Sequence, residues 1–503
     1  MAAPRQKEMN ERATVVATTT LADPLSLSGE DVVGGEVDIV RESRPATDYL
    51  TINRMAQANA AALARKIAGK LREHSHQAWL VGGCVRDLLL GHPPKDYDVA
   101  TSAPPGDVLR LFPGADEVGA HFGVVLVHEE GAQVEVAAFR TEGPYSDGRR
   151  PDHVTFETDP RRDAERRDFT INAMMMDPFS GEVLDFAGGR EDLKRRLIRT
   201  VGEPRARFAE DHLRMIRAVR FAARLGFVIE PATMSAIGEM AAAISKVAGE
   251  RVREELNRIL TSGAARRGFE LLDESGLLVE ILPEIAAMKG VEQPPDYHPE
   301  GDVWIHTLLM LERLHEPSVT LAWGVLLHDV GKHTTFRRAD RIRFYGHTEE
   351  GIRLGAGILR RLRFSNEEMV QILALIQNHM RFMHVMQMNE STLKRFLRTK
   401  RFDEHLELHR VDCLASHGKL ENFDYARRKL EDLTEEDLRP KRLLNGEDLM
   451  AAGYQPGPAF RRIFEELETA QLERRVTNKE EATRFVVERY EPPEGKPRKG
   501  AGT

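Results

Sequence analysis

Strand-like patterns are confined to the first part of the chain, and this limits the fold more than any other feature. Apolar or alternating runs occur around Trp79 and at residues 124–128, 134–139 and 174–176, with the length and periodicity of strands. Beyond Asp185 the periodicity is helical almost without interruption. The sequence therefore predicts an α+β head with a mixed sheet, followed by all-α regions.

The chain is too long for a single hydrophobic core, since its 503 residues exceed the usual size of one domain. Composition shifts and a Pro-rich break at 291–301 suggest the boundaries. We expect a disordered N-terminal segment (1–48), a head (49–185), a helical neck and body (186–295), a further helical domain (302–420), a C-terminal helical module (421–491) and a disordered tail (492–503). Individual helices are predicted over 51–72, 211–225, 231–247, 250–260, 264–278 and 302–314.

Composition narrows the class of protein. No apolar run reaches the length of a membrane span, and the two cysteines, Cys84 and Cys413, provide neither a disulfide framework nor a paired zinc motif. We therefore expect a cytoplasmic protein. The net charge of −8 argues against indiscriminate polyanion binding, but the basic stretch 190–224 can supply a local RNA-binding surface. Residues 194–199 alone fit a solvated helix face equally well.

A glycine turn and two aspartates lie close together in the head. An apolar strand runs into Gly82-Gly83, whose backbone N–H groups can face a triphosphate. Asp96 and Asp98 are two apart in an extended segment, so both carboxylates project from one face and can share divalent metal. Glu135, on a strand-like run, is a candidate third carboxylate.

Two Mg²⁺ ions held by these carboxylates would lower the pKa of an attacking hydroxyl and stabilise departing pyrophosphate, which is the chemistry of nucleotidyl transfer. An isolated Asp-x-Asp is common in surface turns. The neighbouring glycine turn and the blocks downstream favour the metal site over that interpretation.

Three further blocks follow the glycine turn in order. They are Arg166-Arg167-Asp168-Phe169-Thr170-Ile171-Asn172, the run from Glu210-Asp211 to Arg224, and the run from Glu250 to Leu256. Together with the glycine turn and Asp96-x-Asp98, they resemble the family of tRNA CCA-adding enzymes and bacterial poly(A) polymerases over about residues 50 to 290.

The resemblance implies a polymerase-beta-like nucleotidyltransferase head that adds CCA to the 3′ end of tRNA, without a template, from CTP and ATP. It implies Mg²⁺ at Asp96 and Asp98, with Glu135 as the expected third catalytic carboxylate. The implied nucleotide-binding residues are Gly83, Arg86, Arg167, Asp211, Arg214, Arg217 and Arg220.

Asp211 and Arg214 suggest how bases are chosen. They are three apart and are expected to be neighbours on one face of a helix. The carboxylate can accept from the exocyclic amine of C or A, and the guanidinium can donate to ring acceptors, whereas U and G present a carbonyl. Arg217 and Arg220 continue at intervals of three, and Arg220 is expected to touch phosphate rather than base. For Arg224 we expect a surface charge.

A second candidate site involves His306, the adjacent pair His328-Asp329, and Asp412. Imidazole and carboxylate groups can jointly hold a transition metal or Mg²⁺. This set, with Val330-Gly331-Lys332 after the pair, resembles the HD phosphohydrolase superfamily.

A metal in this site would generate hydroxide to hydrolyse a phosphomonoester or cyclic phosphate. His347 and His379 are candidates for holding a second metal. The implied activity is repair of a damaged RNA 3′ end before nucleotide addition.

Two stretches bear on the alternatives. Residues 141–152 resemble the family's flexible loop for switching from C to A addition, although their composition fits an ordinary surface loop equally well. Residues 121–125 read His-Phe-Gly-Val-Val where family members often show Gly-Thr-Val, and this stretch lacks the Gly-basic-basic-Phe signature of the bacterial poly(A) polymerases. CCA addition is favoured. A poly(A) polymerase, an A-adding enzyme, and an HD hydrolase with an inactive head remain the alternatives.

Overall fold

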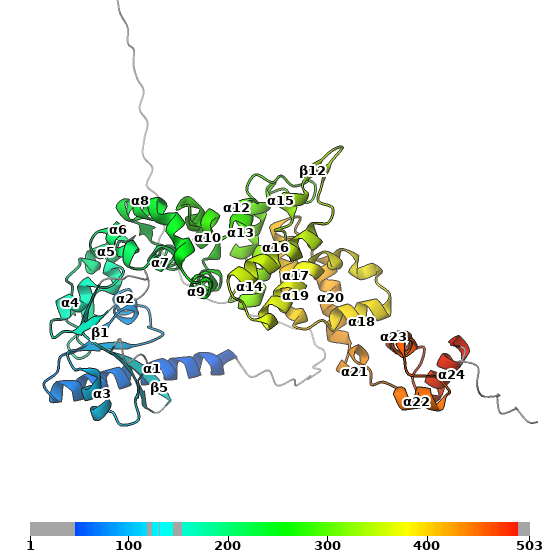
Figure 1. Ribbon diagram of the computed structural model, residues 1–503, viewed down its shortest axis with the longest axis horizontal. Helices are drawn as coiled ribbons and strands as arrows, with labels where there is room; N and C mark the ends of the chain where they lie inside the picture. Colours follow the sequence, from blue (N-terminus) through cyan, green and yellow to red (C-terminus); the bar gives the residue numbers. More distant parts are fainter. Residues whose placement is uncertain (1–45, 118–122, 130, 144–152, 491–503) are drawn as a thin grey trace, which may run out of the picture. The chain divides into compact units, whose positions relative to one another are not determined.

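The computed structural model describes residues 46–117, 123–129, 131–143 and 153–490 (Figure 1). The expected disordered segment up to residue 45, most of the switching loop, His121-Phe122 and the polar tail lie outside these residues. The longest helix of the head, α1 (Ala46–Glu73), begins five residues before the helix predicted from the sequence.

A seven-stranded mixed sheet forms the centre of the head, as expected. Its strand order is β3–β4–β5–β2–β1–β8–β9, and the β2–β5 pair is parallel while the other neighbours are antiparallel. The strands are β1 (Ala78–Val81), β2 (Asp98–Thr101), β3 (Asp116–Glu117), β4 (Val124–Glu129), β5 (Ala132–Ala138), β8 (Met175–Met176) and β9 (Val183–Leu184). A separate hairpin pairs β6 (Arg140–Glu142) with β7 (Val154–Phe156).

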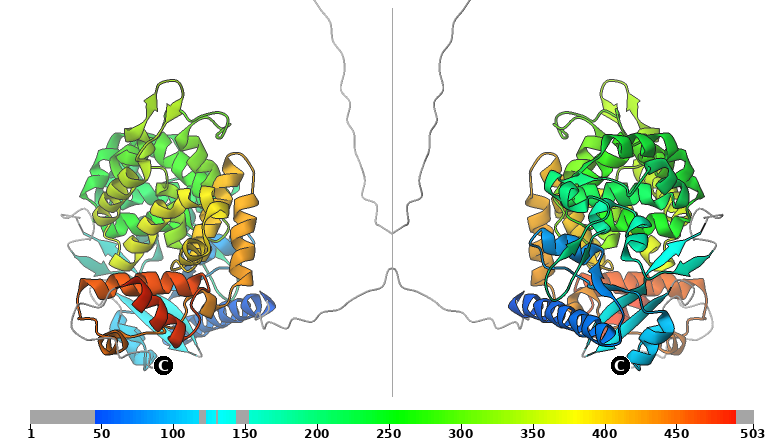
Figure 2. Two further views of the ribbon diagram at one scale, coloured as in Figure 1. Left: turned by 90° about the vertical axis from the view of Figure 1, so that its right-hand side faces the viewer. Right: turned by 90° about the vertical axis from the view of Figure 1, so that its left-hand side faces the viewer.

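The alternation of side chains decides which face of the sheet is covered. In β5, Val134 and Val136 are buried while Gln133 and Glu135 are exposed. The buried side chains join one cluster with apolar residues of α1, such as Ile67, and α1 lies alongside the sheet (Figures 1 and 2). The face that carries Glu135 is thus left open for polar groups.

Short helices connect the sheet to the neck. These are α2 (Gly83–Leu89), α3 (Pro105–Leu111), α4 (Pro160–Glu165), the 3₁₀ helix η2 (Thr170–Asn172) and α5 (Gly189–Arg195). The helices that follow are α6 (Pro204–Glu210), α7 (Leu213–Leu225), α8 (Pro231–Met240), η3 (Ala241–Lys246), α9 (Gly249–Leu260), α10 (Ala265–Glu274), α11 (Leu277–Ile281) and α12 (Pro283–Ala286).

Three predicted helices of the neck and body begin later or are divided in the structure. The helix expected from residue 211 begins at Leu213, and the one expected over 231–247 continues from α8 as a 3₁₀ helix. The helix expected over 264–278 is interrupted at Gly276, whose φ of 75° is left-handed. Periodicity identified the apolar faces, but the ends were set by local backbone geometry.

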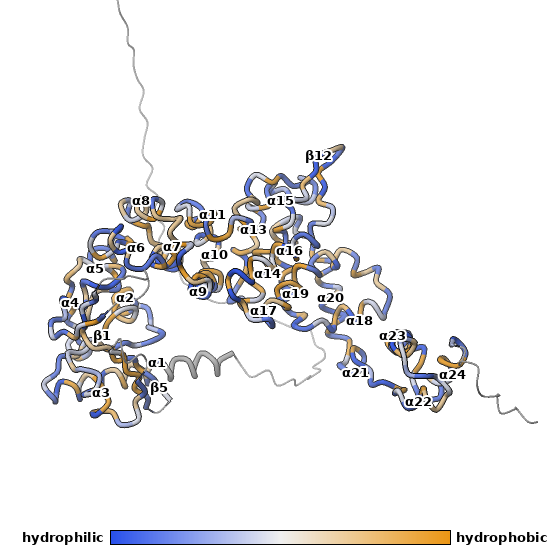
Figure 3. Tube along the Cα trace, in the orientation of Figure 1, coloured by the Kyte–Doolittle hydropathy of each residue, from blue (hydrophilic) through white to orange (hydrophobic). Residues whose placement is uncertain are grey.

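The next helices carry the second candidate site. They are α13 (Val303–Glu312), α14 (Val319–Leu327), α15 (Lys332–Thr335), α16 (His347–Arg361), α17 (Asn366–Asn378), the 3₁₀ helix η4 (His379–Gln387), α18 (Glu390–Leu397) and α19 (Phe402–Ala415). Ser318 caps α14 by accepting from the backbone N–H of Leu321. Because α14 is apolar along its length (Figure 3), it packs centrally, with Trp323 fully buried.

The last helices are α20 (Glu421–Asp432), α21 (Glu435–Leu438), α22 (Gly446–Ala451), α23 (Pro458–Leu472) and α24 (Lys479–Arg489). Residues from Leu444 to Val486 have a hydrophobic cluster of their own. No helix in the described part of the chain combines the length and apolar character needed to cross a bilayer.

Two short strand pairs depart from the all-helical expectation after Asp185. Strand β10 (Leu197–Ile198) pairs in parallel with β11 (Val228–Ile229), and β12 (Arg337–Arg338) forms an antiparallel hairpin with β13 (Ile342–Arg343). Each strand has only two residues, which is too short for a periodicity signal.

Candidate active sites

Gly82 forms the turn between β1 and α2 with a φ of 74°, a conformation that side chains rarely adopt. A Cβ here would lie 3.5 Å from Oδ2 of Asp98 and 3.5 Å from Nη1 of Arg167. The turn, one expected metal ligand and one expected nucleotide contact are therefore immediate neighbours. Gly83 follows as the first residue of α2.

Asp98 and Glu135 are paired across neighbouring strands. They are register partners in the parallel β2–β5 pair, so both side chains project from the same face. Burial, and next the negative charge of Glu135, raise the pKa of Asp98 to about 6; Asp96 acts in the same direction and Arg167 opposes it. Because a divalent cation removes such repulsion, these residues fit Mg²⁺, and Asp96, Asp98 and Glu135 would hold it.

Asp163 orients the arginine doublet beside this cluster. Its carboxylate, only 1% exposed, accepts from Nη2 of Arg167 at 3.0 Å and from Nε of Arg166 at 2.9 Å. The sequence reasoning missed Asp163, although its spacing of three and four residues from the doublet on a helix is a signal for such pairs. Arg167 is thereby held in a defined position next to Asp98.

Arg86 lies inside the head. Its side chain, 3% exposed, donates to Asn172 Oδ1 at 2.8 Å and to Asp87 Oδ1 at 2.8 Å. The bond to Asn172 holds α2 against η2 and so brings the glycine turn together with the segment that follows the arginine doublet.

Asp211 and Arg214 do not share a helix face, so that expectation was wrong. Asp211 is extended and precedes α7, with φ −146° and ψ 105°, because its carboxylate accepts from the backbone N–H of Leu213. The same carboxylate accepts two bonds from Arg251, at 3.1 and 2.7 Å. Arg214 instead bonds Glu210 and the backbone oxygen of Arg207.

Arg217 and Arg220 are also engaged within the protein. Arg217 donates from Nε to Asp168 at 3.0 Å. Arg220, 7% exposed, donates to Glu255 at 2.6 Å and stacks on the Phe221 ring at 4.2 Å. Glu255, from the expected motif at 250–256, thus links α9 to α7. Because its guanidinium is buried and bonded to Glu255, Arg220 is not exposed for the expected contact with phosphate.

The second candidate site gathers side chains from helices far apart in sequence. His306 lies in α13, His328 follows α14 and Asp412 lies in α19, and their ligand atoms lie within 4.8 Å of one another. Nε2 of His306 is 3.1 Å from Oδ1 of Asp412. Helix packing has brought together three of the four expected ligands.

Asp329, the fourth, belongs to an adjacent group with His347 and His379. Its Oδ1 lies 3.8 Å from Nε2 of each histidine, while its Oδ2 lies 3.1 Å from Nε2 of His328 and so joins the two groups. The two groups form what we call the HD cluster: His306, His328, Asp329, His347, His379 and Asp412.

The histidine rings of the HD cluster are oriented for metal binding. In His328, His347 and His379, Nδ1 lies 2.7–2.8 Å from the backbone oxygen three residues earlier, so Nδ1–H donates and Nε2 keeps its lone pair. Burial lowers the pKa of His379 to about 4, which keeps it neutral. Buried His328 Nε2 and Asp329 Oδ1 have no hydrogen-bond partner among the described residues, and the donor set fits a divalent cation.

Glu300 orients the remaining histidine. Its Oε1 lies 2.6 Å from Nδ1 of His306 and 2.9 Å from Nδ1 of His298. Burial by itself would lower the pKa of His306, but the nearby carboxylates of Asp412 and Glu300 outweigh it and raise that pKa to about 9. A histidine that faces a carboxylate with one ring nitrogen and a ligand site with the other is typical of metal centres. Glu300 was missed because it lies in the Pro-rich break, where no periodicity signals it.

Comparisons with known proteins give matches along these parts of the chain. Family models match for the Poly A polymerase head domain (residues 78–199), the probable RNA and SrmB-binding site of polymerase A (226–289) and the HD domain (301–414). The CCA-adding enzymes of Geobacillus stearothermophilus and Limosilactobacillus reuteri are 47% identical over 211 residues and 46% identical over 263 residues. These matches cover 42% and 52% of this chain, and 52% and 62% of the relatives. The chain thus spans about half the length of the curated relatives it matches.

A solved structure covers more of the molecule. The Bacillus stearothermophilus CCA-adding enzyme in complex with CTP has a TM-score of 0.66 and 30% identity, over 85% of this chain and 96% of that one. The chain belongs to the CCA-adding enzyme family. The Thermotoga maritima CCA-adding enzyme in complex with tRNA shares the fold, with a TM-score of 0.52 and 20% identity over 85% of this chain and 94% of that one.

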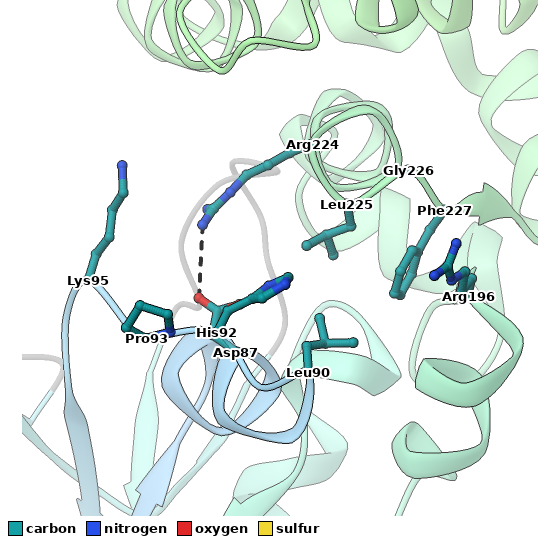
Figure 4. A pocket seen from close by; sticks show the side chains of 10 residues that line it. All are labelled: Asp87, Leu90, His92, Pro93, Lys95, Arg196, Arg224, Leu225, Gly226 and Phe227. Carbon is teal, nitrogen blue, oxygen red and sulfur yellow. Dashed lines mark ion pairs between the residues drawn. The ribbon is translucent and has the colours of Figure 1, made fainter. Parts of the chain in front are cut away.

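This member of the CCA-adding enzyme family also has a cationic cavity between α2 and the end of α7. The cavity, of about 360 Å³, is lined by Lys95, Arg196 and Arg224 together with Asp87 (Figure 4). Arg224, expected as a surface charge, is indeed exposed and lies 3.9 Å from Asp87. Positive charge thus lies next to the segment that carries Asp96.

Proposed function

We propose that this protein adds CCA to the 3′ end of tRNA from CTP and ATP by two-metal nucleotidyl transfer. The observation that carries the proposal is the pairing of Asp98 with Glu135 beside Gly82 and Arg167. Membership in the CCA-adding family, and the CTP and tRNA complexes of its relatives, support the choice of substrates. Both cysteines are buried free thiols, which supports a reducing compartment, and we propose the cytoplasm.

In the proposed reaction, the tRNA 3′-hydroxyl attacks the α-phosphorus of the bound nucleotide. A new P–O bond forms, the bond to the β-phosphate breaks, pyrophosphate leaves and the hydroxyl proton passes to solvent. Mg²⁺ at Asp96, Asp98 and Glu135 would lower the pKa of the hydroxyl and neutralise pyrophosphate. Arg167, held by Asp163, contributes a fixed positive charge beside the triphosphate.

Base choice is assigned to Asp211 and Arg214. The Asp211 carboxylate accepts from the exocyclic amine of C or A, and Arg214 donates to the ring acceptors. Arg251 positions Asp211 through its two bonds. In the structure Arg214 bonds Glu210 and the Arg207 backbone, so we infer that an incoming base takes over part of this bonding.

Incorporation assays separate the proposal from its rivals. The protein is incubated with tRNA that lacks CCA and with tRNA that ends in CC, with CTP, ATP or both. Addition that stops after C, C and A supports CCA synthesis. A ladder of A identifies a poly(A) polymerase, and addition of A to the CC end alone identifies an A-adding enzyme. If Asp96→Ala incorporated nucleotide as wild type does, all of the transferase functions would be excluded, and an HD hydrolase with an inactive head would remain.

The HD cluster supports a second candidate function, metal-dependent hydrolysis of a phosphomonoester or 2′,3′-cyclic phosphate at a damaged 3′ end. The observation that favours it is the pair of adjoining buried ligand groups around Asp329, which suits a transition metal or Mg²⁺. His328→Ala should abolish hydrolysis of 2′,3′-cyclic AMP and spare nucleotide addition. Asp96→Ala is the matched control, because it should do the reverse.

A further inference from the structure

The β12–β13 hairpin projects from the helices that hold the HD cluster (Figures 1 and 2). It lies between Lys332 and His347, and Arg337 pairs with Arg343 and Arg338 with Ile342 in its ladder. The chain thus leaves the HD motif, forms this arm and returns directly into a cluster histidine. We call residues 336–345 the arginine arm.

Positive charge dominates the arm. Residues 337–343 contain four arginines and a single acid, Asp340. Arg338 pairs with Glu292, and Arg343 with Asp340 at 2.8 Å. Arg337 and Arg341 are exposed and make no ion pair with any residue that the structure describes. Two guanidinium groups are therefore available to phosphate.

Exposed aromatic rings accompany these charges. Tyr345 is 70% exposed and Phe336 is 37% exposed, and the guanidinium of Arg343 lies 5.8 Å from the Tyr345 ring centre. Aromatic faces interleaved with arginines bind single-stranded RNA, because bases stack on the rings while the cations contact the backbone.

The base of the arm contacts the HD cluster through Phe344. Nζ of Lys332 lies 5.2 Å from the Phe344 ring centre and 2.7 Å from Oδ2 of Asp329. The backbone oxygen of Phe344 accepts from Nδ1 of His347 at 2.8 Å. An RNA strand lying along the arm would accordingly lead toward the cluster.

We propose that the arginine arm binds the single-stranded 3′ end of RNA and delivers its terminal phosphate to the HD cluster. The inference rests on the proposed hydrolase function for its purpose, whereas RNA contact by the arm does not depend on catalysis. The arm is then a determinant of substrate size, which distinguishes an RNA end from a mononucleotide.

The test compares the double variant Arg337→Ala/Arg341→Ala and the variant Tyr345→Ala with a matched control, Arg360→Ala/Lys400→Ala. The control removes two exposed cations of the same domain outside the arm. Binding is read without metal, from amide hydrogen exchange of residues 336–345 in full-length protein with tRNA that ends in a 2′,3′-cyclic phosphate. Protection should appear in wild type and control and be lost in the double variant.

Kinetics add the second readout. The kcat/KM for the RNA substrate should fall about tenfold in the double variant. The slope of log(kcat/KM) against the logarithm of the salt concentration should become shallower by about 0.7 for each phosphate contact that is lost. Hydrolysis of 2′,3′-cyclic AMP should stay unchanged, since neither arginine contacts the cluster.

Equal protection and kinetics in all variants would overturn the proposal, as would an equal loss on RNA and mononucleotide, which would make the arm a structural support. Failure of wild type to hydrolyse either substrate would refute the hydrolase function. The exchange experiment would still decide whether the arm binds RNA.

Discussion

Replacing Asp168 by Asn should weaken the junction between the head and α7 by about 2 kcal/mol. Burial alone would raise the pKa of Asp168, but Arg217 outweighs it and lowers the pKa from 3.8 to about 2. That difference corresponds to about 2 kcal/mol of stabilisation of the ionised form. In Asp168→Asn, Arg217 keeps the more distant carboxylate of Glu255, at 3.9 Å, as an ion-pair partner.

Native-state hydrogen exchange measures this energy locally, which suits a chain with several cores. At pH 7 the amides of α7 should exchange about 30-fold faster in the variant, since 1.4 kcal/mol is a factor of ten. The stabilisation is complete above the pKa of Asp168 in the unfolded chain, near 4, and is lost as the pH falls toward 2. The α7 amides of Asp168→Asn and wild type should therefore exchange at similar rates in acid.

Asp116→Asn provides the control for this experiment. Asp116 lies 3.0 Å from His128, but its side chain is 72% exposed, so its loss should change little. The reasoning is refuted if Asp168→Asn and wild type exchange equally at pH 7, or if their difference persists at pH 2. In either case, kcat/KM for CTP measured in Asp168→Asn would test whether Arg217 still acts on the nucleotide when Asp168 does not hold it.

Three further predictions concern separate groups. Asp98→Asn should abolish nucleotide incorporation, yet it should raise the thermal midpoint of the metal-free protein at pH 8. Burial and Glu135 raise the pKa of Asp98 to about 6, so its negative charge costs up to about 3 kcal/mol of stability at that pH; an unchanged midpoint would contradict this. Burial lowers the pKa of His405 to about 4, so stability should decrease as the pH falls from 6.5 to 4, by up to about 3 kcal/mol. His405→Gln should reduce that loss, measured as thermal midpoints at pH 7 and 4.5; equal losses would disprove the assignment. Glu300→Gln should weaken metal binding 10- to 100-fold, because Glu300 orients His306; metal content after dialysis checks it, and full retention would exclude the role.

Much of the fold followed from local patterns. The mixed sheet and the helical remainder were predicted from periods of two and 3.6 residues, which depend only on which face of an element is buried. The candidate HD ligands were predicted from residue type and order and from the resemblance to the HD superfamily, and the helices bring the candidate ligand atoms of His306, His328 and Asp412 within 4.8 Å of one another. Two-residue strands such as β12 left no such pattern.

Partners of charged side chains could not be predicted in the same way. Asp211 was expected beside Arg214, but Arg251, forty residues later, bonds it instead. Arg220 pairs with Glu255 and is buried. Which arginine reaches which carboxylate depends on how α7 and α9 pack, and sequence spacing within one helix carries no information about a neighbouring helix.

The sequence by itself determined the order of α+β head and helices, the glycine turn with its aspartates, and the residue types of both sites. Only the tertiary structure decided that Asp98 lies opposite Glu135, that Asp163 and Glu300 orient functional groups, and that an arginine arm meets the HD cluster. The physical reason is that local periodicity encodes which side of an element is buried. Electrostatic contacts form between groups that burial brings together, whatever their separation in the chain.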